Sequence, residues 1–203
     1  FTPLMIAVKR GEIQCVANLI RAGADVNKRD SEGFTPLHNA SRNGGHGVSP
    51  YNTSKFCKIM KLLIDAGSDI NALDVRSCST ALHMTCKSGS IKQTLLLLRS
   101  GANHSIMDNQ AYTALHRAVT SDDNQDLVLI MTAYGCLANT YNNVNSTPLH
   151  DAFTQCGRTA KMIDILNLFA TLEMGQRDSE GNTLLHQSAR CSDMLDTIMK
   201  ECT

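Results

Sequence analysis

Apolar residues recur along the chain at spacings of three and four, the period of one face of an α-helix. Leu37 and Ala40 form one such face, and Ile59, Leu62 and Leu63 form another. A glycine follows the second face at position 67, where it predicts a left-handed end to the helix. The pattern therefore predicts pairs of short helices rather than strands.

A four-residue motif marks the start of the first helix of each pair. Its copies are Thr2-Pro3-Leu4-Met5, Thr35-Pro36-Leu37-His38, Thr80-Ala81-Leu82-His83, Thr113-Ala114-Leu115-His116, Thr147-Pro148-Leu149-His150 and Thr183-Leu184-Leu185-His186. The threonines are 33, 45, 33, 34 and 36 residues apart. Threonine caps a helix well, and proline suits the first turn. The chain is therefore a series of repeated units.

Further motifs mark the turns between the units. Gly-Ala-Asp-Val-Asn at 23–27 recurs as Gly-Ser-Asp-Ile-Asn at 67–71, and Asp-x-x-Gly turns stand at 30–33 and 178–181. These motifs resemble the ankyrin repeat, over the whole chain apart from one insertion. The resemblance implies an all-α solenoid of helix-turn-helix units with β-hairpin-like connections. The units must stack, because one unit cannot bury its own apolar face.

The motifs predict a single domain of six repeats. Its expected repeats are 1–29, 30–73, 74–107, 108–141, 142–177 and 178–203. The second repeat contains an insertion at 45–55 between its two helices, and the Gly, Pro, Ser and Asn there predict a loop. The loop is either functional or a neutral surface insertion. Because the first residue is not Met and the end repeats depart from the pattern, we expect the chain to be part of a longer protein.

Composition narrows the classes of partner. Nineteen Lys and Arg balance nineteen Asp and Glu, so no net field favours nucleic acid or a membrane surface. No apolar stretch reaches the roughly 18 residues of a membrane span. The eight cysteines include no C-x-x-C pair. We therefore expect a reducing compartment, the cytoplasm or the nucleus.

The sequence predicts neither catalysis nor a metal site. Five of the seven histidines occupy the same place in the repeat: His38, His83, His116, His150 and His186. The resemblance implies that these imidazoles make structural hydrogen bonds. No Gly-rich phosphate loop and no zinc-ligand spacing is present. We predict no catalytic residues, no metal, no cofactor and no small-molecule substrate.

The positions that the repeat leaves variable supply the candidate partner-binding residues. Aromatic residues precede the threonine at Phe34 and Tyr112, and basic residues of several repeats would form a stripe along the first helices. Aromatic and Arg residues are enriched at binding hot spots, and Arg pairs carboxylates in a two-pronged way. The alternatives are rings that pack against the adjacent hairpin and a basic stripe that is only a solvated polar face. The predicted partner-binding residues are Phe34, Arg42, Arg76, Lys87, Tyr112 and Arg117.

The resemblance implies a non-catalytic protein–protein interaction module, the regulatory or adaptor domain of a larger protein. Its partner would be a protein, and the basic stripe favours an acidic segment of it. The alternatives are the array of an enzyme-containing parent such as a ubiquitin-ligase receptor, a regulator of the NF-κB-inhibitor or Notch type, and a structural scaffold. Asn27 and Asn71 resemble the asparagines that the hydroxylase of the hypoxia pathway modifies in ankyrin proteins. The alternative is that these two side chains only hydrogen-bond their loops.

Overall fold

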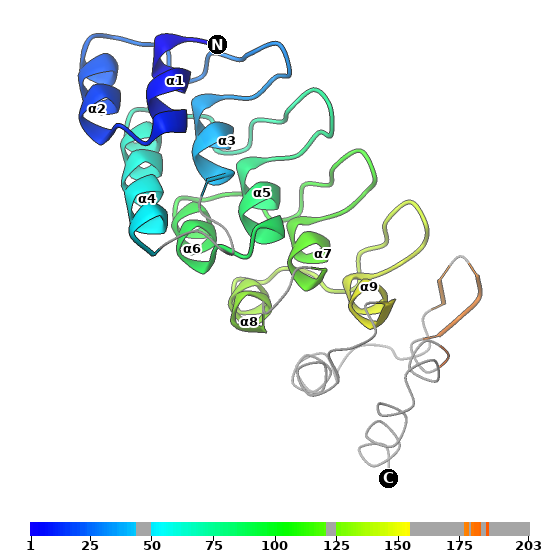
Figure 1. Cartoon of the computed structure of the whole chain (residues 1–203). Helices are drawn as coiled ribbons and strands as arrows, with labels where there is room; N and C mark the ends of the chain where they lie inside the picture. Colours follow the sequence, from blue (N-terminus) through cyan, green and yellow to red (C-terminus); the bar gives the residue numbers. More distant parts are fainter. Residues whose placement is uncertain (44–49, 121–124, 155–176, 179, 184–185, 187–203) are drawn as a thin grey trace.

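The structure is a computed structural model, and it describes residues 1–43, 50–120, 125–154, 177–178, 180–183 and 186. The helices are α1 (Pro3–Arg10), α2 (Ile13–Arg21), α3 (Pro36–Ser41), α4 (Pro50–Asp65), α5 (Ala81–Lys87), α6 (Ile91–Arg99), α7 (Ala114–Val119), α8 (Gln125–Ala133) and α9 (Pro148–Thr154). Odd-numbered helices stack in one row and even-numbered helices in a second row, with the connecting hairpins on the far side of the first row (Figure 1). The predicted all-α solenoid is confirmed.

Each first helix begins where the threonine motif predicts. The Thr35 hydroxyl accepts the His38 N–H at 3.4 Å, and the Thr35 N–H donates to His38 Nδ1 at 3.1 Å. Thr80 and His83 repeat this capping box. The motif therefore fixes the start of the helix by local hydrogen bonds, before any contact between repeats.

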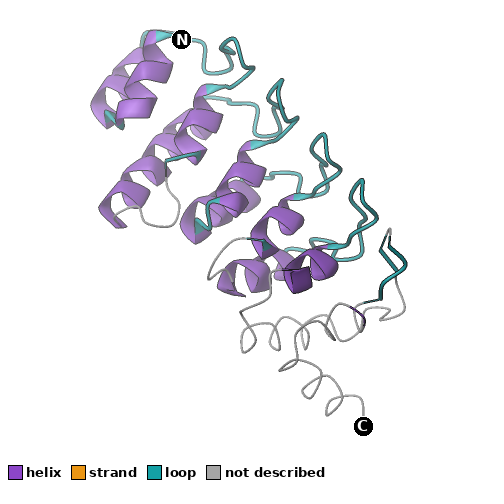
Figure 2. Ribbon diagram, turned by 45° about the vertical axis from the view of Figure 1, so that its right-hand side comes forward, coloured by secondary structure: helices purple, strands orange, loops and turns teal. Residues whose placement is uncertain are grey.

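The connecting hairpins are each closed by the side chain of their first residue. Asp30 Oδ1 accepts the N–H of Phe34 at 2.9 Å. Asn142 replaces the aspartate in the fifth repeat, and its Oδ1 accepts the N–H of Ser146 at 2.9 Å. An amide oxygen thus performs the same closure as a carboxylate. Figure 2 shows the resulting loops as a row of similar hairpins beside the helices.

The core lies between the two rows of helices. Leu37, Ala40, Ile59 and Leu63 are buried, and Leu62 is partly buried against them. One continuous cluster runs from Leu4 of α1 to Ala152 of α9. Since each repeat contributes only a few of these side chains, its burial depends on both neighbours.

The prediction of a loop at 45–55 is wrong for residues 50–55. Residues 50–55 are the first residues of α4, which is longer than the other helices that the structure describes. Proline at the first helical position is preorganised for a helix, so Pro50 starts α4 where the composition suggested a loop. Lys55 then extends to the turn at Gly11, between α1 and α2. Residues 45–49 lie outside the described residues, as does most of the sixth repeat.

None of the described helices is long and apolar enough to cross a membrane.

The contact between neighbouring hairpins predicts different costs for two glycine substitutions. Gly33 has φ +80° and Gly67 has φ +87°, so alanine at either position takes the left-handed conformation, which costs about 1–2 kcal/mol. A Cβ at Gly33 would also lie 2.5 Å from Val75 Cγ2 and 2.7 Å from Val75 N, whereas at Gly67 it would meet nothing within 4 Å. Gly33→Ala should therefore lower the free energy of unfolding by about 1–3 kcal/mol more than Gly67→Ala. Urea titration measures both, and equal losses would contradict the close packing of the hairpins.

Candidate protein-binding groove

A groove of about 640 Å³ lies between the hairpins and the first helices of repeats two to four. The hairpins form one side and α5 forms the floor, while Arg42, which follows α3, and Arg117 of α7 complete the lining. The lining residues are Glu32, Phe34, Arg42, Asp74, Arg76, Ser77, Ser79, His83, Met84, Lys87, Ser88 and Arg117. The lining therefore mixes an aromatic ring, a thioether and small polar groups with charged side chains.

The charges of this lining are mainly positive. Its cations are Arg42, Arg76, Lys87 and Arg117, and its anions are Glu32 and Asp74. Arg76 Nη1 lies 3.4 Å from Glu32 Oε1, but both side chains are well exposed, so this ion pair contributes little to stability.

The Asp74 carboxylate is occupied by its own hairpin. It accepts N–H groups of Arg76, Ser77 and Ser79 at 2.7–2.9 Å. Burial raises its pKa, but the hydrogen bond from the Ser77 hydroxyl and those from the three backbone N–H groups outweigh burial, and the pKa lies below its usual value. The negative charge of Asp74 is thus directed at backbone donors, and the basic side chains determine what the groove attracts.

Two of the cations stand over aromatic rings. The Arg42 guanidinium carbon is 5.3 Å from the centroid of Phe34, and that of Arg117 is 4.3 Å from the centroid of Tyr112. Lys9 lies over Phe1 in the same way, with Nζ 3.6 Å from the ring centroid. Such contacts are worth about 0.5–1 kcal/mol at exposed sites. They also restrict the cations to a few conformations.

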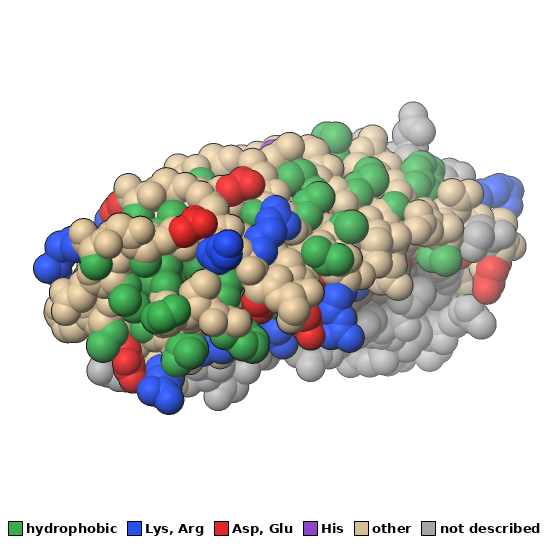
Figure 3. All heavy atoms as spheres, turned by 90° about the horizontal axis from the view of Figure 1, so that it is seen from above, with side chains coloured by type: hydrophobic (Ala, Val, Ile, Leu, Met, Phe, Trp, Pro, Cys, Tyr) green, Lys and Arg blue, Asp and Glu red, His purple; other side chains and the backbone are tan. Residues whose placement is uncertain are grey.

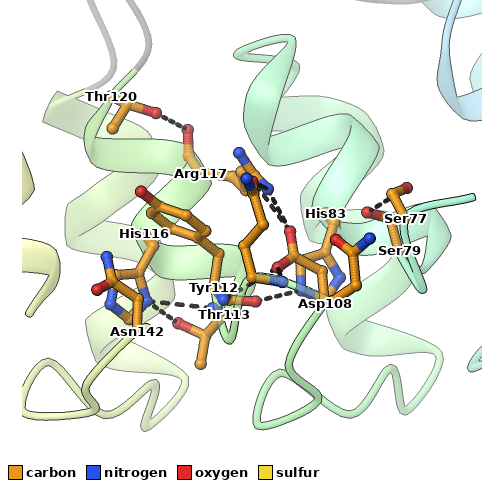
Figure 4. A network of polar contacts seen from close by, with 12 residues as sticks. Ser77, Ser79, His83, Asp108, Tyr112, Thr113, His116, Arg117, Thr120 and Asn142 are labelled. Atoms are coloured by element: carbon orange, nitrogen blue, oxygen red, sulfur yellow. Dashed lines mark hydrogen bonds and ion pairs between the residues drawn. The ribbon is translucent and has the colours of Figure 1, made fainter. Parts of the chain in front are cut away.

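Arg117 is held further by a buried carboxylate (Figure 4). Its Nε donates to Asp108 Oδ2 at 3.0 Å, its Nη2 forms an ion pair with the same oxygen, and Nη2 also donates to Gln110 Oε1 at 3.0 Å. The Asp108 side chain is fully buried. Arg117 is therefore a fixed part of the groove wall, and its charge is already neutralised by Asp108.

The histidines of the repeat join each helix to the next hairpin. Nδ1 of His38, His83 and His116 accepts the N–H of the capping threonine, so the proton of the neutral ring is on Nε2. Nε2 then donates to a carbonyl of the following hairpin, at 3.2 Å for Ser79 and 3.0 Å for Tyr112. The predicted structural role of these imidazoles is confirmed.

Burial lowers the pKa of these histidines. Desolvation is the main cause for His38 and His83, and it lowers the pKa of His116 to about 4. In water an imidazole has a pKa of about 6.5. The folded array thus holds the rings neutral across a range of pH where the unfolded chain is protonated.

The structure brings five of the six predicted partner-binding residues to the lining of this groove: Phe34, Arg42, Arg76, Lys87 and Arg117. Tyr112 lies beside them beneath Arg117. Phe34 and Tyr112 contact His38 and His116 of their own repeats, with ring centroids 5.8 and 5.3 Å apart. That these six residues bind a partner stays a prediction.

Sequence reasoning missed the groove residues Met84 and Ser88 and the buried carboxylate that anchors Arg117. The sequence signal that could have found them is their position within the repeat. Met84 and Arg117 both stand four residues after the motif threonine, and Asp108 begins the hairpin of the same repeat. A comparison of equivalent positions would have placed Met84 beside Arg117 and Asp108 at the start of the hairpin before Arg117.

Asn27 and Asn71 each bind the next repeat. Asn27 Nδ2 donates to the Gly67 carbonyl at 3.0 Å, and its Oδ1 accepts the Asp69 N–H at 2.7 Å. Asn71 Oδ1 accepts the Asn103 N–H at 2.8 Å. The side chains are exposed but hydrogen-bonded. Their hydroxylation stays a prediction, and it would act on a contact between repeats.

The lowered histidine pKa values predict a loss of stability in acid. The histidines of the unfolded chain take up protons below about pH 6.5, while those of the folded array do not. Their contribution to the free energy of unfolding is therefore fully present above that pH and is lost as the pH falls. It should fall by about 1.4 kcal/mol per pH unit for His116 as the pH approaches 4, and the lowered pKa values of His38 and His83 act in the same direction. Urea titrations between pH 7 and pH 4.5 measure this slope. His116→Gln, which keeps an acceptor for the cap, should show a shallower slope, and an unchanged slope would contradict the assignment.

The chain matches the family model for ankyrin repeats (3 copies) over residues 1–51 and 51–142. It is 30% identical to an ankyrin repeat protein of fowlpox virus over 142 residues, 69% of this chain and 38% of that protein.

Two further relatives carry the array within longer proteins. Mouse ankyrin repeat and SOCS box protein 16 is 36% identical over 58% of this chain and 25% of its own length. The chicken nuclear factor NF-kappa-B p105 subunit is 31% identical over 58% of this chain and 14% of its own length. The chain thus spans well under half of each of these relatives. With the paired helices, capping boxes and hairpins above, these matches show that the chain belongs to the ankyrin-repeat family, whose arrays are protein-interaction modules.

Proposed function

We propose that this array binds an acidic segment of a partner protein in the groove between its hairpins and first helices. The observation that carries the proposal is the gathering of Arg42, Arg76 and Lys87 in one groove lining, beside Arg117, which Asp108 holds in place. Guanidinium groups pair with carboxylates through two parallel hydrogen bonds, which gives direction as well as attraction. An acidic segment satisfies these groups better than a neutral one does.

The fixed position of the cations supports this proposal. A long basic side chain that becomes ordered on binding costs about 0.5–1.5 kcal/mol. Arg42 is already stacked on Phe34, and Arg117 is already held by Tyr112 and Asp108. Part of the ordering is therefore complete before the partner arrives. Modest contacts can then add up to a specific affinity.

The wider role that we propose is that of a regulatory or adaptor domain in a larger protein. Ankyrin repeats are generally non-catalytic, and the relatives carry the array within longer chains. A reducing compartment, the cytoplasm or the nucleus, is part of the proposal. Cys86 and Cys136 lie in the core as free thiols, and burial raises the pKa of Cys136 to about 12.

The test uses a phage-displayed library of random linear peptides selected on the whole chain. Asp and Glu should be enriched, and a labelled selected peptide should bind with an affinity that falls as salt is added. The Arg42→Glu, Lys87→Glu double variant should bind it at least about tenfold more weakly, a change of about 1.4 kcal/mol. Fluorescence anisotropy measures the affinity.

The matched control reverses two charges on the second row of helices, Lys58→Glu on α4 and Lys92→Glu on α6. Both lysines are exposed and neither lines the groove. Thermal unfolding checks that both double variants remain folded. A selected pool without acidic enrichment, or equal losses in the two variants, would sink the proposal.

A further inference from the structure

An apolar row crosses the hairpins at one position of the repeat. The residue just before the Asp or Asn that closes each hairpin is Leu73, Met107 and Tyr141 in three successive repeats. These side chains are 37%, 43% and 39% exposed. We call the three residues the hairpin stripe. Single exposed apolar residues are ordinary, but a set at equivalent positions of adjacent units forms a continuous surface.

The hairpins that carry the stripe are bonded to one another. Asn109 donates its N–H to the Ser77 carbonyl at 2.9 Å, and Asn143 donates its N–H to the Gln110 carbonyl at 3.1 Å. These bonds join each hairpin to the next, so the hairpins that carry the stripe lie side by side. The stripe is therefore a surface of fixed shape.

The fold does not require apolar side chains at this position. Arginine occupies it in the neighbouring hairpins, at Arg29 and Arg177. The Arg29 guanidinium donates to the Leu73 carbonyl at 2.6 Å, so a basic group borders the stripe directly. Leucine, methionine and tyrosine are thus a property of this chain, and they leave apolar area in water.

The tips of the same hairpins add to the apolar surface. Val75 is 72% exposed and Val144 is 55% exposed. The tips of the fourth and fifth hairpins hold no charged residue at 109–111 and 143–145, whereas Glu32 and Arg76 stand at the earlier tips. Figure 3 shows this change, with green side chains and few charges on the upper right of the face and blue and red side chains gathered toward the left.

The hairpin stripe adjoins the basic groove. Leu73 directly precedes Asp74, a groove-lining residue, and the stripe continues from there toward the C-terminal repeats. Basic side chains therefore lead into an apolar surface along one side of the array. A single linear segment can contact both only if its acidic residues are followed or preceded by apolar ones.

We infer that the hairpin stripe receives the apolar residues of the same partner segment whose acidic residues enter the groove. This inference rests on the proposed function. The partner is thereby defined by chemistry as a protein segment with adjoining acidic and apolar blocks. Leu73, Met107 and Tyr141 select the apolar block, and the groove cations select the acidic one.

The experiment sequences the peptides that the whole chain selects from the same library. They should carry an apolar block at a constant distance from an acidic block. The Leu73→Gln, Met107→Gln, Tyr141→Gln triple variant should bind a selected peptide at least tenfold more weakly. Serine in place of the apolar block should weaken binding to the natural chain and cause little further loss in the triple variant, because coupled sites are not additive.

The matched control is Leu129→Gln, Tyr134→Gln, Leu137→Gln, which removes apolar side chains that are 44%, 39% and 58% exposed on and after α8. It should bind the peptide as the natural chain does, and thermal unfolding checks both triple variants. Acidic peptides that bind both triple variants equally would overturn this inference and leave the proposed function standing. Selected peptides that bind the Arg42→Glu, Lys87→Glu variant as tightly as the natural chain would overturn both this inference and the proposed function. Self-association in sedimentation, lost only in the stripe variant, would assign the stripe to a second copy and overturn the inference.

Discussion

The array depends on a histidine that makes two hydrogen bonds in opposite directions. Nδ1 accepts from the capping threonine of its own helix, and Nε2 donates to a carbonyl of the next hairpin, as in His38 with Thr35 and Ser79. One neutral ring thus couples the start of a helix to the place of the following repeat. A protonated ring could not serve both partners, because it offers two donors and no acceptor. Secondary structure and stacking are therefore set by the same side chain, and burial keeps that side chain neutral.

This coupling explains why the binding surface can vary while the fold stays constant. The histidines, the hairpin aspartates and the bridging asparagines Asn27 and Asn71 all use backbone partners. Positions between these residues carry different side chains in different repeats. The residue four positions after the threonine is Met84, Arg117 and then Asp151 in successive repeats. Arg117 is fixed by Asp108, whereas Asp151 is buried against Ser146 and Asn142, and burial raises its pKa. The same backbone position thus serves a cation in one repeat and a shielded carboxylate in the next.

Sequence reasoning succeeded where one repeat determines its own structure. Thr35, Pro36 and His38 specify a helix start by bonds within four residues, so the unit, its length and the row of basic positions could be predicted. It failed at 50–55, where composition suggested a loop but Pro50 starts α4. It also missed the stacked pairs, because the spacing between ring and cation is not constant. Arg42 follows Phe34 by eight residues and Arg117 follows Tyr112 by five, yet both cations lie over the ring. Such contacts depend on how the hairpin folds back onto the helix, which periodicity does not describe.

The net charge of the chain does not show how its charged residues are distributed over the structure. Nineteen basic and nineteen acidic residues balance, yet the groove at repeats two to four is basic. The balance is possible because several carboxylates are directed inward. Asp30, Asp74 and Asp108 close hairpins through backbone N–H groups, and Asp108 also neutralises Arg117. A carboxylate held by backbone donors projects little field into the groove, whereas a cation at the end of a first helix keeps its field there. The repeat architecture therefore separates charge without changing composition, and a neutral array can present a basic groove beside an apolar row of hairpins.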